Sequence, residues 1–179
     1  GSKEEELAKI FRANPGGIAI TRQADGVCMD ANDAYLAIVG YSRAQLVGRS
    51  LVDLGIMPAA TRDQVRATLR QQGAIRGLDL QIFNARGEPV DILYSLEQID
   101  FDGEPCYLGL VFDVTANKKL AAHANRLAAI VEASHEAIIS AHIDGTVIFV
   151  NHSAEELYGV SAAEAVGRNI ADIALPQNI

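Results

Sequence analysis

The sequence predicts an α+β protein: a five-stranded antiparallel sheet with helices on one face, then a connecting helix and part of a second domain of the same kind. Two short early segments flank an Asp-Gly turn as in a hairpin, three late segments alternate apolar and polar residues as strands do, and helical patterns separate the two groups. In addition, residues 18–53 align without a gap with residues 137–172 at an offset of 119, with eleven identical positions. This internal repeat indicates two units of one fold.

The first elements are a helix and a hairpin. Lys3–Ala13 carries acidic residues in its first turn, where they suit the helix dipole, and Asn14-Pro15-Gly16-Gly17 ends it. Gly17–Thr21 and Val27–Ala31 are predicted strands, and the Asp25-Gly26 pair between them is typical of a tight turn.

Helices follow the hairpin. Asn32 is the predicted N-cap of a helix over Asp33–Val39, which Gly40 closes. Ser42 is expected to cap a short helix that ends at Gly48, and a further turn is expected over Leu51–Leu54. A longer helix is predicted over Thr61–Gln72 from its apolar spacing.

Three strands complete the predicted sheet: Arg76–Asn84, a strand from Val90 to Leu96, and Cys106–Asp113, with a loop over Asp100–Pro105. Alternation predicts that one set of side chains faces the helices: Leu78, Leu80, Ile82, Val90, Ile92, Leu96, Leu108, Leu110 and Phe112, with Tyr94 and Cys106 as polar groups among them. The opposite face is expected to carry Ala19, Leu93, Tyr107 and Val111.

A connecting helix is predicted from Ala116 onward. Its apolar residues are spaced by four, three and four positions, as in the seam of a coiled coil: Leu120, Ala124, Leu127 and Val131. This spacing favours a parallel dimer of linker helices. The seam is barely two heptads long, so a helix packed on its own domain is the alternative.

The predicted division is an N-terminal helix over 1–14, a first domain over 15–115, a linker helix over 116–134 and a truncated second domain over 135–179. The second domain lacks counterparts of the long helix and the last three strands. Two strands rarely make a stable fold alone, so we expect it to be poorly ordered or completed by another chain.

Composition limits the function. The net charge of −8 disfavours nucleic-acid binding, and no apolar run is long enough to cross a membrane. We interpret Cys28 and Cys106 as reduced thiols in the core of a cytoplasmic protein. The first domain has no histidine and the chain shows no metal-binding spacing, so catalysis is not expected of this segment.

Several motifs in order carry a resemblance to a known family. They are Asn14-Pro15, Asp25-Gly26, Asn32, Gly40-Tyr41-Ser42, Leu46-Val47-Gly48-Arg49, Gly103-Glu104-Pro105 and Phe112-Asp113-Val114-Thr115. Together they resemble the PAS sensory domains over residues 5–115, and again from about residue 130. The resemblance implies a homodimeric sensor or adaptor, placed before an output domain such as a bacterial histidine kinase or diguanylate cyclase. It also implies that Asp113 ties the last strand to the linker helix and that Thr115 starts that helix.

The resemblance also permits a test for cofactors. The cysteine-containing run of flavin photoreceptors is absent, and the Thr61–Gln72 helix has no histidine to bind haem, so neither cofactor is expected in the first domain. The candidate pocket residues are Tyr94, Cys106, Ile92, Leu80, Leu108 and Leu110. Since none of the strand residues predicted to face inward is charged, the expected ligand is small and neutral. The alternative is a filled core and a ligand-free dimerisation or relay module.

Overall fold

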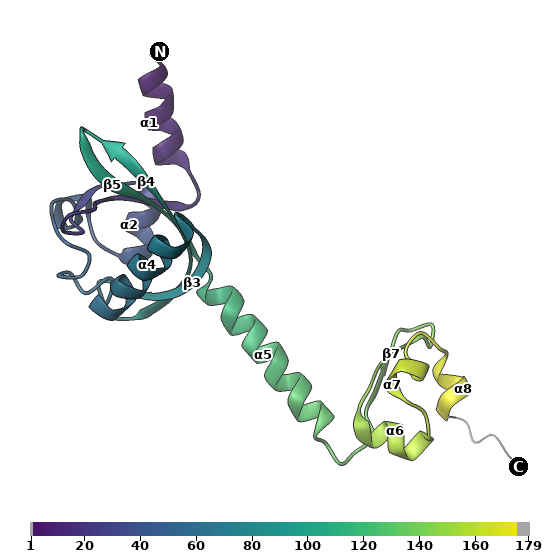
Figure 1. The fold of residues 1–179 in the computed structure, drawn as a ribbon. Helices are drawn as coiled ribbons and strands as arrows, with labels where there is room; N and C mark the ends of the chain where they lie inside the picture. Colours follow the sequence, from purple (N-terminus) through teal and green to yellow (C-terminus); the bar gives the residue numbers. More distant parts are fainter. Residues whose placement is uncertain (1, 175–179) are drawn as a thin grey trace, which may run out of the picture. The chain divides into compact units, whose positions relative to one another are not determined.

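The computed structural model describes residues 2–174 (Figure 1). The chain forms two compact units, Gly1–Lys118 and Lys119–Ile179. The elements of the first unit are α1 (Lys3–Ala13), β1 (Gly17–Arg22), β2 (Cys28–Ala31), α2 (Asp33–Val39), α3 (Arg43–Leu46), α4 (Ala59–Gln72), β3 (Ile75–Phe83), β4 (Pro89–Phe101) and β5 (Glu104–Asp113).

The five strands form one antiparallel sheet in the order β2-β1-β5-β4-β3, and α2 and α4 cover one of its faces (Figure 1). The predicted fold class is confirmed. The predicted loop over Asp100–Pro105 is wrong, because strands run through most of it and only Asp102 and Gly103 make the turn. Both residues have positive φ angles, 49° and 78°, as a tight two-residue hairpin turn requires.

The register of β5 reverses the predicted faces of that strand. Tyr94 lies opposite Val111 and Leu96 lies opposite Gly109, and paired residues project to the same side of a sheet. Three side chains predicted to face the helices therefore lie on the opposite face: Leu108, Leu110 and Phe112. Cys106 lies on that opposite face as well.

The predicted outer face is corrected by the same register. Tyr107 and Val111 face the helices, as does Ala19 of β1, whereas Leu93 lies on the outer face as expected. The sequence pattern of β5 does not show which of its two faces meets the helices, because both faces carry bulky side chains. Pairing with β4 decides the orientation, because Tyr94 and Leu96 belong to the helix-covered side.

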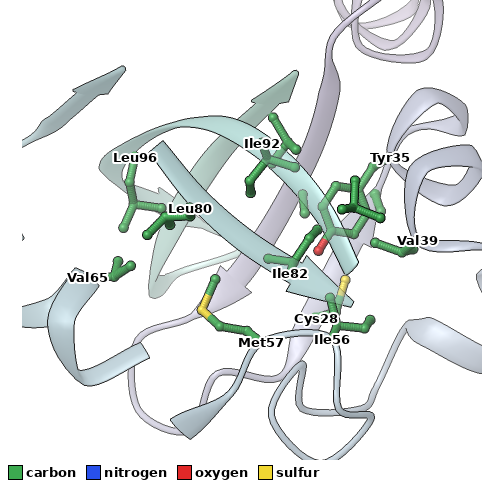
Figure 2. Packing of buried hydrophobic residues seen from close by; sticks show 14 of the residues in the cluster. Cys28, Tyr35, Val39, Ile56, Met57, Val65, Leu80, Ile82, Ile92 and Leu96 are labelled. Carbon is green, nitrogen blue, oxygen red and sulfur yellow. The ribbon is translucent and has the colours of Figure 1, made fainter. Parts of the chain in front are cut away.

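The core lies between the helices and this side of the sheet. Figure 2 shows Val65 of α4 close to Leu80 and Leu96 at one end, and Tyr35 close to Val39 at the other. Most of these side chains expose less than a tenth of their surface, and burying each contributes about 1.5–3 kcal/mol. This packing holds the short helices on the sheet, since α3 has only four residues and could not form alone.

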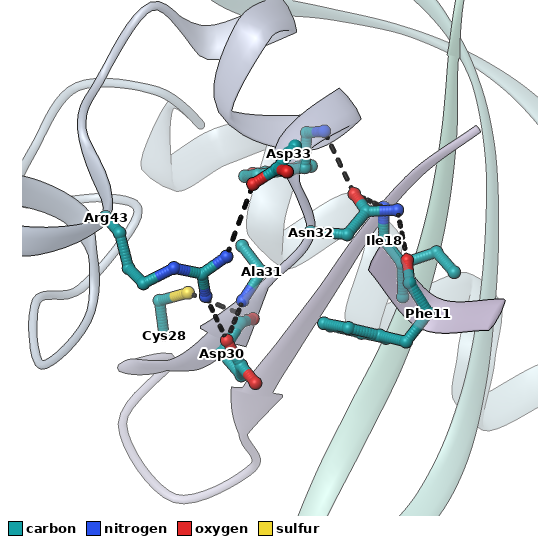
Figure 3. Close-up of polar contacts among 9 residues, drawn as sticks. Phe11, Ile18, Cys28, Asp30, Ala31, Asn32, Asp33 and Arg43 are labelled. Carbon is teal, nitrogen blue, oxygen red and sulfur yellow. Dashed lines mark hydrogen bonds and ion pairs between the residues drawn. The ribbon is translucent and has the colours of Figure 1, made fainter. Parts of the chain in front are cut away.

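A buried amide joins three elements of the first unit. The Asn32 side chain has no exposed surface, and its oxygen accepts hydrogen bonds from the backbone N–H groups of Ile18 (2.8 Å) and Tyr35 (3.0 Å). Its nitrogen donates to the carbonyl groups of Phe11 (2.9 Å) and Gly16 (3.0 Å). Asn32 is thus the predicted cap of α2 and also holds the end of α1 and the start of β1 (Figure 3).

An exposed arginine ties α3 to the same region. Arg43 forms ion pairs with Asp30 of β2 and with Asp33 of α2 (Figure 3). Because these side chains are partly or well exposed, the pairs contribute modestly, about 0–1 kcal/mol each.

The second unit contains α5 (Thr115–Glu132) from Lys119 onward, then β6 (Ile139–Ala141), β7 (Val147–Val150), α6 (His152–Tyr158), α7 (Ala162–Ala165) and α8 (Ile170–Ala174). The two strands pair with each other, and a small core of Val147, Val150, Ala154, Ala165 and Ile173 lies beneath them. Among the described residues, neither strand has a second partner. Completion by another chain stays a prediction.

The second unit repeats the buried amide. The oxygen of Asn151 accepts from the N–H groups of Ile138 (2.8 Å) and Ala154 (3.0 Å). Its nitrogen donates to the carbonyls of Val131 (3.0 Å) and Glu136 (2.9 Å). The last turn of α5 is therefore bonded to Asn151 in the way that the last turn of α1 is bonded to Asn32.

These hydrogen bonds also correct the gap-free alignment of the two repeated segments. Asn32 and Asn151 are 119 positions apart, but their strand partners Ile18 and Ile138 are 120 apart. The turn of the first hairpin has one residue more than that of the second, so the gap-free alignment is wrong for β1. Ala19, opposite Ala31, corresponds to Ile139, opposite Val150.

We expect Asn32→Ala to lower the free energy of unfolding by about 3 kcal/mol, because four buried backbone groups lose their partner. Amide hydrogen exchange should accelerate in the first unit and stay unchanged in the second, and Asn151→Ala should do the reverse. Asn117→Ala, at an exposed position of α5, is the matched control and should change neither. Equal acceleration in both units by either variant would contradict this assignment.

Two ionisable groups of the core favour the protonated state. Burial raises the pKa of the Cys28 thiol from 9.0 to about 11, and the carboxylate of Asp30 adds to the effect. Burial also raises the pKa of Tyr35 above its ordinary value of 10.0. The unfolded chain therefore loses these protons at a lower pH than the folded chain does.

The free energy of unfolding should accordingly be constant just below pH 9 and fall between pH 9 and about 11, where the unfolded Cys28 ionises first and Tyr35 follows. Chemical denaturation followed by circular dichroism across this range measures the slope. Cys28→Ala and Tyr35→Phe should each reduce the slope. A slope unchanged in both variants would assign the alkaline loss to other groups.

Candidate functional site

A cavity of about 50 Å³ lies inside the first unit, between α4, the segment before α4 and the helix-covered side of the sheet. Its lining residues are Thr21, Gly26, Leu51, Val52, Met57, Arg62, Val65, Arg66, Tyr94, Leu96 and Tyr107. One water needs roughly 10–15 Å³ on this measure, so the cavity has room for about four atoms of that size. Figure 2 shows three of the apolar lining residues, Met57, Val65 and Leu96, with Leu80 beside them.

A second cavity of about 20 Å³ lies next to the first, deeper under α2. The two share Thr21, Leu51, Met57 and Tyr94 in their linings. These four residues therefore lie between the two cavities.

Tyr94 brings a hydroxyl group into both linings. Burial raises the pKa of Tyr94, so the hydroxyl stays protonated and can donate a hydrogen bond. Gly109 gives the ring its room, since a Cβ at that position would lie 3.3 Å from Cε2 and 3.4 Å from the hydroxyl oxygen of Tyr94. Within residues 2–174, no hydrogen-bond partner of this hydroxyl is found.

Two arginines of α4 also line the first cavity, Arg62 and Arg66. The Nε atom of Arg62 is buried and finds no hydrogen-bond partner in the described part of the chain. One Nη atom of Arg62 pairs with the exposed Asp63 at 3.3 Å. The expectation of a neutral ligand was based on the strand side chains alone, none of which is charged. Arg62 and Arg66 of α4 also line the cavity, so an uncharged lining can no longer be assumed.

The predicted pocket residues divide into two groups. Tyr94 lines both cavities and Ile92 lines the smaller one, while Leu80 is buried in the core beside them. Cys106, Leu108 and Leu110 lie on the other side of the sheet and line neither cavity.

Sequence reasoning missed Arg62, Arg66 and Met57. The spacing of Arg62 and Arg66 by one helical turn, next to the buried Val65 and Leu69, was a usable signal. It places two cations along the border of the buried face of α4.

The start of α5 is joined to the sheet by two hydrogen bonds and one ion pair. The Asp113 carboxylate accepts a hydrogen bond from the Thr115 N–H at 3.0 Å. The Thr115 hydroxyl accepts one from the Asp91 N–H of β4 at 3.0 Å, and Lys118 pairs with Asp79 of β3 at 3.3 Å. Displacement of β3 or β4 would therefore reach the first turn of α5 directly.

The predicted linker seam is free of buried residues. Leu120 and Leu127 expose 68% and 50% of their surface, and Ala124 is exposed as well, while Val131 is partly buried near Asn151. An exposed leucine pair on an isolated helix is what a dimeric seam would cover. The dimer itself stays a prediction.

Among the residues that the structure describes, no helix has the length and hydropathy of a membrane span. Nor does any group of three His, Cys, Asp or Glu side chains among residues 2–174 have the arrangement of a metal site.

Comparisons with known proteins agree with this architecture. Three solved structures show the likeness: the PAS domain of a protein from Colwellia psychrerythraea (TM-score 0.55, 20% identity, covering 64% of this chain and 99% of that one), a PAS domain from a two-component sensor histidine kinase (0.52, 16%, 62% and 96%), and the PAS domain, in complex with ethanol, of a LuxR-family transcriptional regulator from Burkholderia thailandensis (0.50, 22%, 60% and 96%). At these identities the likeness concerns the fold. No curated protein matches the chain.

The family model of the PAS fold matches residues 5–111 and, a second time, residues 125–177. The two matches cover most of the chain and correspond to the two units of the structure. The chain therefore belongs to the PAS family and contains two units of it.

Proposed function

We propose that the first unit is the sensor of a signalling protein and that it binds a small molecule in the cavity beside α4. The observation that carries the proposal is the cavity itself, which is mostly apolar, and whose lining residue Arg62 has a buried Nε atom without a hydrogen-bond partner in the described part of the chain. Its small volume favours a ligand of a few atoms over haem or flavin. The PAS domain from Burkholderia thailandensis in complex with ethanol is a relative of the same fold whose ligand is of that size.

The junction at α5 supports a route for the signal. The cavity is lined by Tyr94 and Leu96 of β4, and the same strand holds Thr115 through the Asp91 N–H. A ligand that shifts β4 by its contacts with Tyr94 would change the position of the α5 start. A ligand moves such an equilibrium only as far as it binds one state better than the other.

The output of the signal belongs to the proposal as well. PAS domains similar to this chain come from sensor histidine kinases, one of them a histidine kinase and response regulator from Geobacter sulfurreducens. We infer an output domain of the histidine kinase or diguanylate cyclase type in a cytoplasmic bacterial protein that dimerises along Leu120, Ala124, Leu127 and Val131. The exposure of Leu120 and Leu127 supports this dimer.

Native mass spectrometry of the 179-residue chain tests ligand and dimer together. The expected result is a dimer carrying extra mass that denaturation releases. Tyr94→Phe should keep the fold and weaken retention of that mass by about tenfold, because the hydroxyl donor is lost. Tyr41→Phe is the matched control, since the Tyr41 hydroxyl bonds the Leu54 carbonyl outside the cavity lining.

The alternative is a relay module without a ligand, and the small volume of the cavity is the observation that favours it. A dimer without extra mass, and without a change in thermal stability across a panel of small metabolites, would support the relay. A monomer at micromolar concentration would contradict the seam.

A further inference from the structure

The charges around the cavity differ from those of the whole chain. The chain has 23 acidic and 15 basic residues, yet the charged residues in the cavity lining are Arg62 and Arg66. An outer hollow of about 270 Å³ shares Arg66 and Tyr107 with the cavity and adds Arg70, again with no acidic residue among its described lining. The opening is therefore a locally positive region, which raises the local concentration of anions.

Arg62, a residue of the cavity lining, has one donor without a partner. Its Nε–H is buried and unpaired, and a buried donor left unpaired is unfavourable. The ion pair with Asp63 engages Nη2, which still carries a second N–H beside Nε–H. A carboxylate is the group that fits an arginine edge, because its two oxygens accept in parallel from two N–H donors.

The other walls define the rest of the ligand. Leu51, Val52, Met57, Val65 and Leu96 are apolar, so the part of the ligand in contact with them is aliphatic, while Thr21, Tyr94 and Tyr107 bring hydroxyl groups to the same lining. Room for about four atoms fits acetate, which has four non-hydrogen atoms, and propionate, which has five, is the largest acid of this kind that we expect to enter. A bare inorganic anion would leave those walls without apolar contact.

We propose that the cavity binds a short aliphatic carboxylate, whose carboxylate group is held by Arg62. This inference rests on the proposed function, since it names the ligand class of the same cavity. Arg66 and Arg70 at the outer hollow attract the anion without bonding to it in the bound state.

The test is a titration of the 179-residue chain with sodium propionate at constant ionic strength, followed by ¹H–¹⁵N NMR. The Arg62 Nε–H resonance and the backbone amides of α4 should shift and saturate. Propionamide has the same shape without charge and should bind at least about tenfold more weakly, the usual difference between charged and neutral hydrogen bonds.

Variants locate the site. Arg62→Gln should weaken propionate binding by about ten- to a hundredfold, because the charged pair of donors is lost. Arg62→Lys keeps the charge but not the paired donors and should fall in between, which also serves if Arg62→Gln folds poorly. Arg70→Gln removes an equal charge from the same helix, outside the cavity lining, and should change the affinity by less than about threefold.

The outcomes separate this inference from the proposed function. Equal binding of propionamide and propionate, or propionate binding that Arg62→Gln leaves unchanged, overturns the carboxylate and leaves a small-molecule sensor. No saturable shift with either compound, together with native mass spectra free of extra mass, overturns both and leaves the relay module.

Discussion

The buried side-chain amide of Asn32 is the interaction on which the first unit depends. All four hydrogen-bonding positions of this amide have partners in the protein. The partners lie in α1, β1, α2 and the turn between α1 and β1. A buried amide is stabilising only when it is fully bonded, so any movement of these elements breaks bonds that nothing else replaces. Asn151 imposes the same constraint on the second unit through α5, α6 and the segment between α5 and β6.

This constraint gives α5 two attachments of different kinds. Its first turn is bonded to β4 and β3 of the first unit through Thr115 and Lys118, and its last turn is bonded to Asn151. The helix between these ends is solvent-exposed and rich in alanine. Leu120 and Leu127 lie on this exposed part of the helix, where the proposed dimer seam would cover them.

The cavity and the start of α5 are connected structurally because residues of β4 contribute to both. The strand runs from Pro89 to Phe101, and Asp91 near its start bonds to Thr115 while Tyr94 and Leu96 line the cavity. Asp91 and Tyr94 are three positions apart in the strand, so the proposed route from ligand to linker needs no long chain of contacts. The arginines of α4 stand across the cavity from this strand, and a ligand held by Arg62 would bear on both.

Local chemistry let the sequence by itself determine most of the elements and the caps at Asn32 and Ser42, since a cap or a glycine turn depends on residues a few positions apart. The family followed from the resemblance of several motifs in order, and the second unit from the internal repeat. The roles of Asp113 and Thr115 at the start of α5 were predicted from family resemblance. Only the tertiary structure decided the faces of β5, because both faces of that strand are apolar and the register against Tyr94 and Leu96 fixes which one meets the helices. It also decided that Arg62 and Arg66 border the cavity, since the position of α4 over the sheet follows from packing across the whole unit and not from the pattern of the helix itself.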